Sequence, residues 1–328
     1  MKTIRWGAIG CGDVTEVKSG PGFQKASNSA LTAVMRRNGD LARDYAVRHK
    51  IAAWYDSADA LIADPQVDAV YVATPPAYHK HYTLLAANAG KPVYVEKPMA
   101  LNAGECLEMI DACRAANVPL FVAYYRRALP RFLKIKEVIE SGILGEIRFV
   151  SITLNEPLPQ DLDSQRLPWR LIPEIAGGGL FADLACHTLD FLDFVFGPIR
   201  LTTGAAVNQA GSYSAEDLVA GTFVFECGIV GSGLWCFSAH TKVDRNEIVG
   251  SKGKLTFSTF GTEPAQVETG SATFEFSAET PPHVQQPLIQ SIVDELNGTG
   301  RCPSRGDSAL RTTRVMDALL GAKVTARP

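Results

Sequence analysis

The sequence predicts an α/β protein in which a doubly wound parallel sheet is followed by an α+β domain with a mainly antiparallel sheet. The chain of 328 residues is long enough for two domains of roughly 100 to 200 residues each. Up to about residue 123, short apolar runs alternate with stretches of helical period, and from about residue 145 closely spaced strand-like runs replace them. The domains are therefore expected at residues 1–123 and 124–328.

The first part of the chain alternates between strand and helix signals. Continuous apolar strands joined by crossover helices are typical of a parallel sheet that is covered on both faces and binds ligands beyond the carboxyl ends of its strands. The expected strands lie in residues 3–10, 30–36, 67–74, 91–96 and 118–125, and the expected helices in 41–50, 80–90 and 103–117.

The second part has a different order. A strand-like run at residues 146–154 precedes a long loop and one helix, and several short strands then follow. Turn signals such as SKGK at residues 251–254 indicate antiparallel pairing. Two helical stretches, at 287–298 and 308–323, close the chain, and the C-terminal helix could pack back on the first domain. The later strands are expected in 199–207, 218–226, 228–239, 246–258 and 271–278.

Composition excludes several classes of protein. A net charge of -3 without a basic run argues against a nucleic-acid partner. No apolar run approaches the roughly 18 residues of a membrane helix, and the amino terminus has no signal-peptide pattern, so a cytoplasmic protein is expected. The seven cysteines form no CxxC pair, which argues against a disulfide framework and a zinc site, and no metal is expected.

A glycine-rich turn follows the first expected strand. In GAIGCGDVT, Gly10 and Gly12 fit the G-x-G-x-x-G/A pattern, Asp13 and Val14 are further candidates for contact with the cofactor, and Thr15 replaces the third small residue. Such glycines let the backbone approach a pyrophosphate, which then lies against the positive end of the helix. The alternative is a tight turn without a ligand, and the setting in a βαβ unit favours the dinucleotide site.

The second expected strand ends in two arginines. A site specific for NAD usually carries an acidic residue here for the ribose hydroxyls, whereas the fork of a guanidinium suits a 2′-phosphate. Arg36 and Arg37 therefore favour NADP over NAD as the cofactor, and NAD stays possible because Asp40 is close. Asp40 could instead cap the following helix.

A lysine ends the expected strand at 91–96. Lys97 would stand at the carboxyl end of a parallel strand, where its ammonium can point at a substrate oxygen, and burial moves a lysine pKa toward the range useful for acid-base chemistry. Pro98 restricts Lys97 to an extended backbone and can form a cis bond with it. The alternative is an ordinary exposed lysine.

A carboxylate and a histidine are spaced four residues apart in a stretch of helical period. Asp183 and His187 would project from one helix face, where the carboxylate fixes the imidazole tautomer and raises its basicity. Asp190 could partner His187 instead. The preceding glycines at 177–179 either allow a ligand to approach the helix or form a flexible loop.

These motifs, with VATPPAYHKHY, EKP and PWRLIPEIAGGGLFADLACHTLDFL, resemble the Gfo/Idh/MocA oxidoreductase family over nearly the whole chain. The resemblance implies a Rossmann domain, a second domain built on a large open sheet, NAD or NADP as cofactor, and a sugar, sugar derivative or cyclic polyol as the small-molecule substrate. It further implies that Lys97, Asp183 and His187 are catalytic and contact substrate where the two domains meet.

The resemblance assigns further residues. It places Thr74, Pro75, His79, Glu96, Trp169 and Arg170 around the cofactor. Tyr124 and Arg126, with Arg127, are candidates for substrate contact, although charges at a helix start are usually solvated. The sequence has Tyr125 where the family often has asparagine, a departure that affects the substrate pocket.

Two other functions stay open. One is a dihydrodiol or dicarbonyl dehydrogenase of the same family, and the other is a non-catalytic regulator that senses NADP. The strands at 218–226 and 228–239 are apolar at too many consecutive positions for a solvent-facing sheet. A homodimer or homotetramer formed through the C-terminal sheet is therefore expected.

Overall fold

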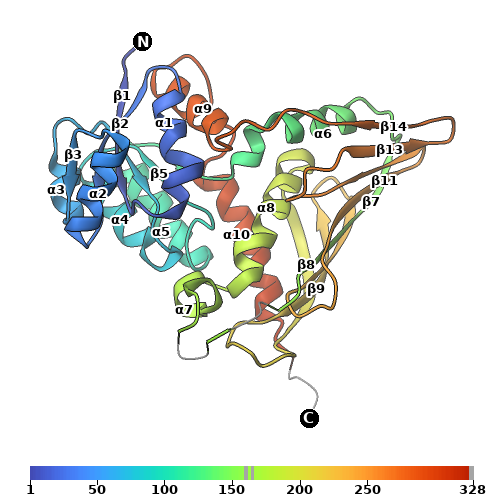
Figure 1. Ribbon diagram of the computed structural model, residues 1–328. Helices are drawn as coiled ribbons and strands as arrows, with labels where there is room; N and C mark the ends of the chain where they lie inside the picture. Colours follow the sequence, from blue (N-terminus) through green and yellow to red (C-terminus); the bar gives the residue numbers. More distant parts are fainter. Residues whose placement is uncertain (159–161, 164–165, 325–328) are drawn as a thin grey trace. The chain divides into compact units, whose positions relative to one another are not determined.

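The structure, a computed structural model, describes residues 1–158, 162–163 and 166–324 (Figure 1). The chain divides into two compact units. The first comprises Met1–Leu129 and Thr280–Leu310, and the second comprises Pro130–Glu279 and Arg311–Pro328. A segment from late in the sequence therefore belongs to the first unit.

The first unit contains a sheet of six strands in the order β3-β2-β1-β4-β5-β6, and every neighbouring pair is parallel. Its strand order reverses at the β1/β4 junction, which in open α/β sheets is where ligands bind. The predicted doubly wound parallel sheet is confirmed. Its strands are β1 (Ile4–Ile9), β2 (Ser29–Met35), β3 (Ala53–Tyr55), β4 (Ala69–Val72), β5 (Val93–Val95) and β6 (Leu120–Val122).

Helices follow the strands, as the apolar period predicts. The cap of α2 is Asn38, whose side chain accepts a hydrogen bond from the Leu41 N–H, so the capping role considered for Asp40 is wrong. Late in the chain, α9 (Gln286–Leu296) packs against α1 within this unit. The helices are η1 (Thr15–Ser19), α1 (Gly20–Lys25), α2 (Gly39–His49), α3 (Ala58–Ala63), η2 (Pro76–Tyr78), α4 (His79–Asn88), α5 (Ala103–Ala115) and η3 (Tyr125–Ala128).

The second unit contains a sheet of eight strands in the order β14-β13-β12-β11-β7-β10-β9-β8. All neighbours are antiparallel except β7 and β10, so the predicted mainly antiparallel sheet is confirmed. The strands are β7 (Ile147–Asn155), β8 (Ile199–Val207), β9 (Leu218–Phe225), β10 (Val230–Cys236), β11 (Val243–Gly250), β12 (Gly253–Phe257), β13 (Ala265–Thr269) and β14 (Thr273–Phe276).

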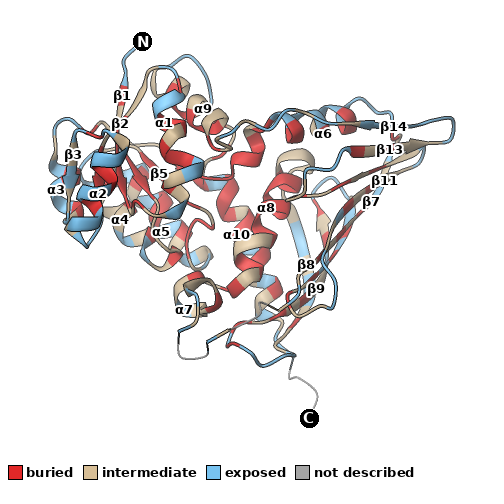
Figure 2. Ribbon diagram, viewed as in Figure 1, coloured by how far each residue is buried: buried red, intermediate tan, exposed pale blue. Residues whose placement is uncertain are grey.

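Helices cover one face of this second sheet. Phe181 of α8 (Gly179–Phe196) packs edge-on against Trp235, with ring centroids 5.3 Å apart. A Cβ added at Gly221 would lie 2.3 Å from the Leu319 side chain, so this glycine lets α10 approach the sheet closely. Figure 2 shows the resulting concentration of buried residues along α8. The remaining helices are α6 (Pro130–Glu140), η4 (Trp169–Leu171), α7 (Pro173–Ala176) and α10 (Gly306–Gly321).

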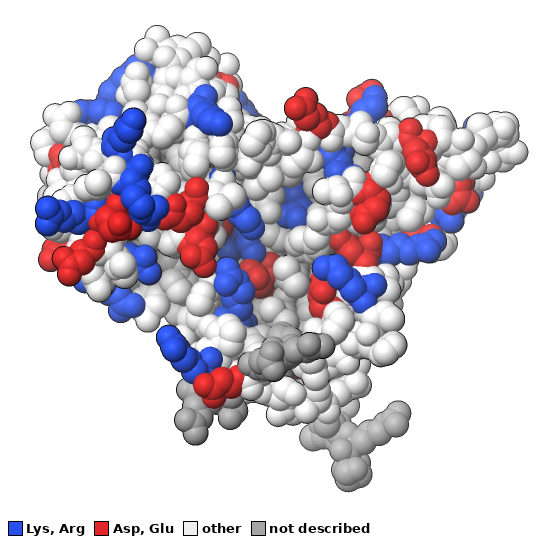
Figure 3. Space-filling view, in the orientation of Figure 1, with Lys and Arg blue, Asp and Glu red and all other residues white. Residues whose placement is uncertain are grey.

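The charged surface is mixed in sign. Lys and Arg are interspersed with Asp and Glu on the face drawn in Figure 3, in keeping with the net charge of -3. Within the described ranges, none of the helices has the length and apolar character needed to cross a bilayer.

Candidate active site

The glycine turn after β1 has the geometry of a dinucleotide-binding turn. Gly10 has a φ of +95°, and a Cβ there would lie 2.8 Å from the Ala73 carbonyl oxygen, so this position requires glycine. A Cβ built on Gly12 meets nothing within 4 Å, which leaves open space beside its backbone. The first glycine therefore shapes the turn, and the second leaves room for a pyrophosphate to approach.

The helix after the turn accommodates a threonine at the third motif position. Thr15 is buried, and its hydroxyl donates to the Gly12 carbonyl at 2.6 Å. The helix continues as a π-helical turn, so the Gly20 N–H donates to the Thr15 carbonyl, which also accepts from the Tyr45 hydroxyl at 2.8 Å. Asp13 is exposed and Val14 is half-buried at the start of this helix.

Two exposed guanidiniums lie beside the turn. An Arg36 NH group donates to the Cys11 carbonyl at 3.5 Å, and the Arg37 guanidinium lies 5.5 Å from the centre of the Tyr78 ring. Both arginines follow the carboxyl end of β2. Asp40 is also exposed, in the first turn of α2. Positive charge is thus available next to the glycine turn, where a 2′-phosphate would need it.

A buried histidine contacts the loop after β4. The Nε2 atom of His79 lies 2.7 Å from the Thr74 carbonyl oxygen, and its Nδ1 lies 3.0 Å from that of Pro98 and 3.2 Å from that of Met99. The ring is 0% exposed, and burial lowers the pKa of His79. This imidazole therefore holds the Thr74–Pro75 loop against the turn after β5 through backbone contacts.

A buried carboxylate precedes Lys97. The Oε1 atom of Glu96 accepts hydrogen bonds from the Tyr71 hydroxyl and from Gln285 Nε2, both at 2.6 Å, and its Oε2 accepts from the Lys97 N–H at 3.2 Å. Lys97 is half-buried and its bond to Pro98 is cis. Glu96 thus holds the backbone of this turn. Gln285 has no recognisable motif around it and was not predicted as part of the site.

The residues after β6 are more buried than expected. Arg126 and Arg127 are 5% and 3% exposed, so the expectation of solvated charges at this helix start is wrong. The Arg126 guanidinium lies 5.1 Å from the centre of the Tyr125 ring, and Arg127 donates to the Pro303 carbonyl at 3.3 Å. Tyr124 is 1% exposed. An aromatic ring and a backbone carbonyl are thus among the groups that accompany these buried cations.

In the second unit, Asp183 and His187 lie one turn apart on α8, as their spacing predicts. The Arg170 Nε lies 3.4 Å from an Asp183 carboxylate oxygen, and its guanidinium stacks 4.4 Å from the centre of the Trp169 ring. The structure thus brings Trp169, Arg170 and Asp183 together at the start of α8.

The backbone conformation and the close packing before α8 explain why glycines occupy this segment. Gly177 and Gly179 have φ values of +84° and +62°, and a Cβ at Gly179 would lie 2.5 Å from the Ala215 Cβ. A Cβ at Gly178 would lie 2.5 Å from the Leu320 side chain. Close packing against neighbouring residues therefore explains this segment better than a flexible loop does.

An aromatic ring lies beside the histidine of α8. His187 is 4% exposed, and its ring centroid lies 5.7 Å from that of the half-buried Phe260 in an edge-to-face arrangement. The loop that carries Phe260 is fixed by Asp244, which accepts hydrogen bonds from the Thr259 and Phe260 N–H groups at 2.9 and 2.6 Å. The alternative partner considered for His187, Asp190, accepts a hydrogen bond from Thr312 of α10 at 3.4 Å.

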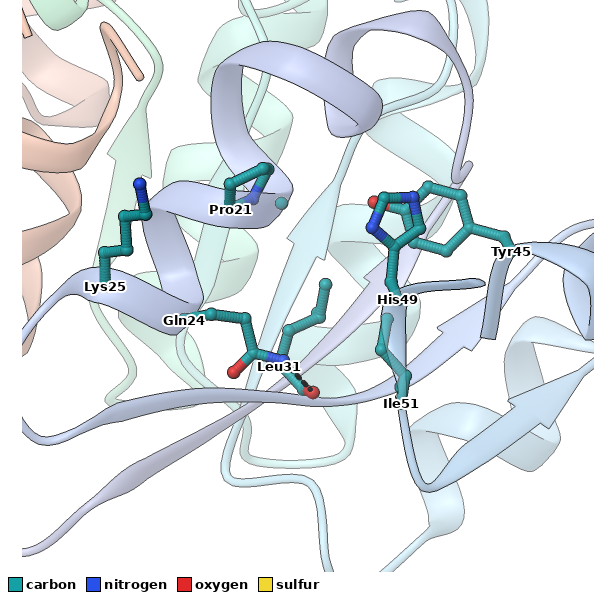
Figure 4. A pocket seen from close by; sticks show the side chains of 8 residues that line it. Pro21, Gln24, Lys25, Leu31, Tyr45, His49 and Ile51 are labelled. Carbon is teal, nitrogen blue, oxygen red and sulfur yellow. Dashed lines mark hydrogen bonds between the residues drawn. The ribbon is translucent and has the colours of Figure 1, made fainter. Parts of the chain in front are cut away.

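A separate cavity of about 190 Å³ lies between α1, β2 and α2 of the first unit (Figure 4). None of its lining residues was predicted to be part of the site. The rings of Tyr45 and His49 form one wall, with centroids 4.2 Å apart and planes tilted by 31°. The lining residues are Gly20, Pro21, Gln24, Lys25, Leu31, Tyr45, His49 and Ile51.

Among the described residues, no cluster of three His, Cys, Asp or Glu side chains could hold a metal ion.

Family models match both halves of the chain. Residues 4–124 match an oxidoreductase family with an NAD-binding Rossmann fold, and residues 132–256 match the GFO/IDH/MocA C-terminal domain. The chain is 40% identical to oxidoreductase P35 of Formosa agariphila over 97% of its own length and 98% of that protein.

More distant relatives have named activities. The chain is 30% identical to mouse trans-1,2-dihydrobenzene-1,2-diol dehydrogenase (76% of this chain, 73% of that protein) and to 1,5-anhydro-D-fructose reductase of Ensifer adhaerens (76% and 74%). The fold is also similar to that of aldose-aldose oxidoreductase from Caulobacter crescentus complexed with glycerol. That structure has a TM-score of 0.87 at 23% identity and covers 98% of this chain and 97% of that chain.

Proposed function

Because the chain belongs to the Gfo/Idh/MocA family of NAD(P)-dependent oxidoreductases, we propose that it moves a hydride between the nicotinamide and a carbonyl or secondary alcohol of a sugar, sugar derivative or cyclic polyol. The observation that carries this proposal is the arrangement around α8, where the polar Arg170–Asp183 pair and His187 occur with the aromatic Phe260. Such a mixture of groups suits a ring with hydroxyl groups on its edge and an apolar face.

The residues of the chain have separate roles in this proposal. NADP(H), when bound, supplies or accepts the hydride. The developing alkoxide takes up one proton during reduction. Lys97 donates it, and His187 stabilises the same oxygen by a hydrogen bond. Asp183 accepts hydrogen bonds from substrate hydroxyls and orients the histidine, while Arg170 keeps this carboxylate in place.

A dihydrodiol dehydrogenase is the second candidate. It is favoured by the mouse relative. The aromatic contact at His187 is compatible with both candidates, because a ring face would pack against Phe260 in either substrate class. Sugars and dihydrodiols both present adjacent hydroxyl groups on a ring. They differ in how much apolar surface accompanies those hydroxyls.

We expect the purified protein to oxidise or reduce at least one cyclic compound in a panel of sugars, cyclic polyols and dihydrodiols, with NADP used better than NAD. Nicotinamide absorbance follows the reaction, and open-chain polyols with the same number of hydroxyl groups are the matched controls. Turnover of dihydrodiols alone would favour the second candidate. Tight NADP binding without turnover of any compound would favour a cofactor-sensing regulator.

We further propose that the protein forms a homodimer or homotetramer through the open face of its second sheet. A row of apolar side chains crosses this face, since Val230 is opposite both Val224 and Phe149, and Leu201 is opposite Val224. Phe149, Leu201 and Val230 are 45%, 52% and 47% exposed in the single chain. An apolar row of this kind is typical of a surface that another layer covers.

Val230→Asp should convert the oligomer to a monomer, because it would place a charge in the centre of the apolar row. Light scattering at micromolar concentration gives the mass. Phe274→Asp is the matched control, since Phe274 is 39% exposed on β14 at the far edge of the sheet and pairs with the inward-facing Val267. A wild-type protein that is monomeric under these conditions would contradict the proposal.

A further inference from the structure

A hydrogen-bonded network of buried polar side chains lies under the turn that carries Lys97. Glu96 is 7% exposed, and Gln285 is 1% exposed. The Gln285 amide donates to Glu96 Oε1 at 2.6 Å, and its oxygen accepts from the Tyr94 hydroxyl at 2.8 Å. The Tyr71 hydroxyl also donates to Glu96 Oε1 at 2.6 Å. A buried carboxylate is thus fixed by donors from β4 and from the segment before α9.

This network ends at the backbone of the proposed proton donor. Glu96 Oε2 accepts from the Lys97 N–H at 3.2 Å, so the position of the carboxylate determines the position of that peptide group. Tyr71 and Tyr94 are fully buried, and burial together with Glu96 raises the pKa of both phenols well above their usual range. Both hydroxyls therefore remain protonated donors at every working pH.

We propose that Gln285 is a positioning residue for catalysis, which acts through Glu96 to fix the turn of Lys97. The segment Thr280–Leu310, which returns to the first unit late in the sequence, would thereby complete the active-site end of the parallel sheet. The inference rests on the role given to Lys97 in the proposed function. Gln285 would thus affect catalysis through its hydrogen bond to Glu96.

The test is Gln285→Glu, which places a second carboxylate within hydrogen-bond distance of Glu96. Two such carboxylates resist ionising together, so the apparent pKa of the pair rises. At acidic pH they share a proton, and the acid hydroxyl replaces the amide as a donor to Glu96. At alkaline pH both ionise and repel. Tyr71, Tyr94, His79 and the neighbouring Lys97 are other titratable groups near Glu96, and all four are present in the wild type and in the variant.

We expect kcat of Gln285→Glu to be close to wild type at mildly acidic pH and to fall by about tenfold as the pair ionises, the effect of one lost hydrogen bond to a charged group. The wild type should lack this additional fall. Gln285→Met, which has no amide to donate, should lose a similar factor at every pH. The Kd for NADP should change little in both variants.

Gln290→Glu is the matched control. It lies on α9, and its amide donates at 2.8 Å to the carboxylate of Asp294, so the substitution creates a similar pair of carboxylates away from Lys97. Its pH profile of kcat should follow that of the wild type. If Gln285→Glu and Gln290→Glu show the same profile, or if Gln285→Met keeps full turnover, the inference is wrong.

A readout without turnover separates this inference from the proposed function. Acetylation of the Lys97 amine by acetic anhydride, measured by mass spectrometry against the other lysines, reports the environment of that side chain. Gln285→Glu should change the relative labelling of Lys97 with pH, and Gln290→Glu should not. If Gln285→Glu alters the labelling of Lys97 but the protein turns over no substrate, only the proposed function is contradicted. If the labelling of Lys97 is unaltered in Gln285→Glu, the inference itself is wrong.

Discussion

Lys97→Ala and His187→Ala should each lower kcat by about 10² to 10⁴, because general acid-base catalysis typically contributes that factor. The lysine follows the carboxyl end of β5, where the Glu96 carboxylate holds its N–H, and the histidine is 4% exposed on α8 beside Phe260. Both are thus placed by groups that fix the surrounding backbone or ring. The Kd for NADP should barely change, and steady-state kinetics with fluorescence titration of the cofactor check both quantities.

Two matched variants control for the loss of a charge or a ring. Lys91→Ala removes a lysine from the amino end of the same strand, where its ammonium donates to the Asp64 and Val67 carbonyls, and His240→Ala removes an exposed histidine of the second unit. Both should keep kcat near the wild-type value. The kcat of the double variant of Lys97 and His187 should fall by much less than the product of the two single reductions, because both residues contribute to the same chemical step. Full turnover by Lys97→Ala would show that this lysine is an ordinary strand-end residue.

Local sequence patterns predicted the parallel sheet and its motif positions, but they missed the short edge strand β3 and the helix α3 that follows it. A glycine turn, a pair of arginines, a TPP stretch and an EKP stretch each follow an apolar run, and the six strands place all of them beyond their carboxyl ends. Spacing likewise placed Asp183 and His187 on one helix face. These predictions succeeded because each depends on residues that are neighbours in the sequence.

Contacts between distant residues were beyond the reach of such patterns. Gln285 bonds to Glu96 across 189 positions, and nothing near residue 285 marks it as a partner of a buried carboxylate. Arg127 donates to the Pro303 carbonyl across 176 positions, so the burial of its charge could not be predicted from its neighbours in the sequence. The parallel β7/β10 pair depends on a long connection through α8, β8 and β9. In each case tertiary contacts determine what the local sequence leaves open.

Replacing both Arg36 and Arg37 with alanine should weaken the binding of NADP at least tenfold and that of NAD much less. We propose that these exposed guanidiniums hold the 2′-phosphate, and each charge-assisted hydrogen bond contributes about 1.5 to 3 kcal/mol, where 1.4 kcal/mol corresponds to a factor of ten in Kd. NAD has no phosphate at this position, so it would lose only a weak long-range attraction. Fluorescence titration with both cofactors gives the ratio of the two Kd values.

The arrangement of the two arginines makes the experiment specific. Arg36 also donates to the Cys11 carbonyl and Arg37 stacks on Tyr78, so alanine at both positions could disturb the glycine turn as well as the phosphate contact. A disturbed turn would weaken both cofactors equally, because both contain the pyrophosphate. Arg114→Ala, at the end of α5 and paired with Asp111, controls for a lost surface charge and should leave both affinities unchanged. Equal losses for NADP and NAD in the double variant would therefore contradict the preference for NADP, whereas a selective loss would assign the 2′-phosphate to this pair.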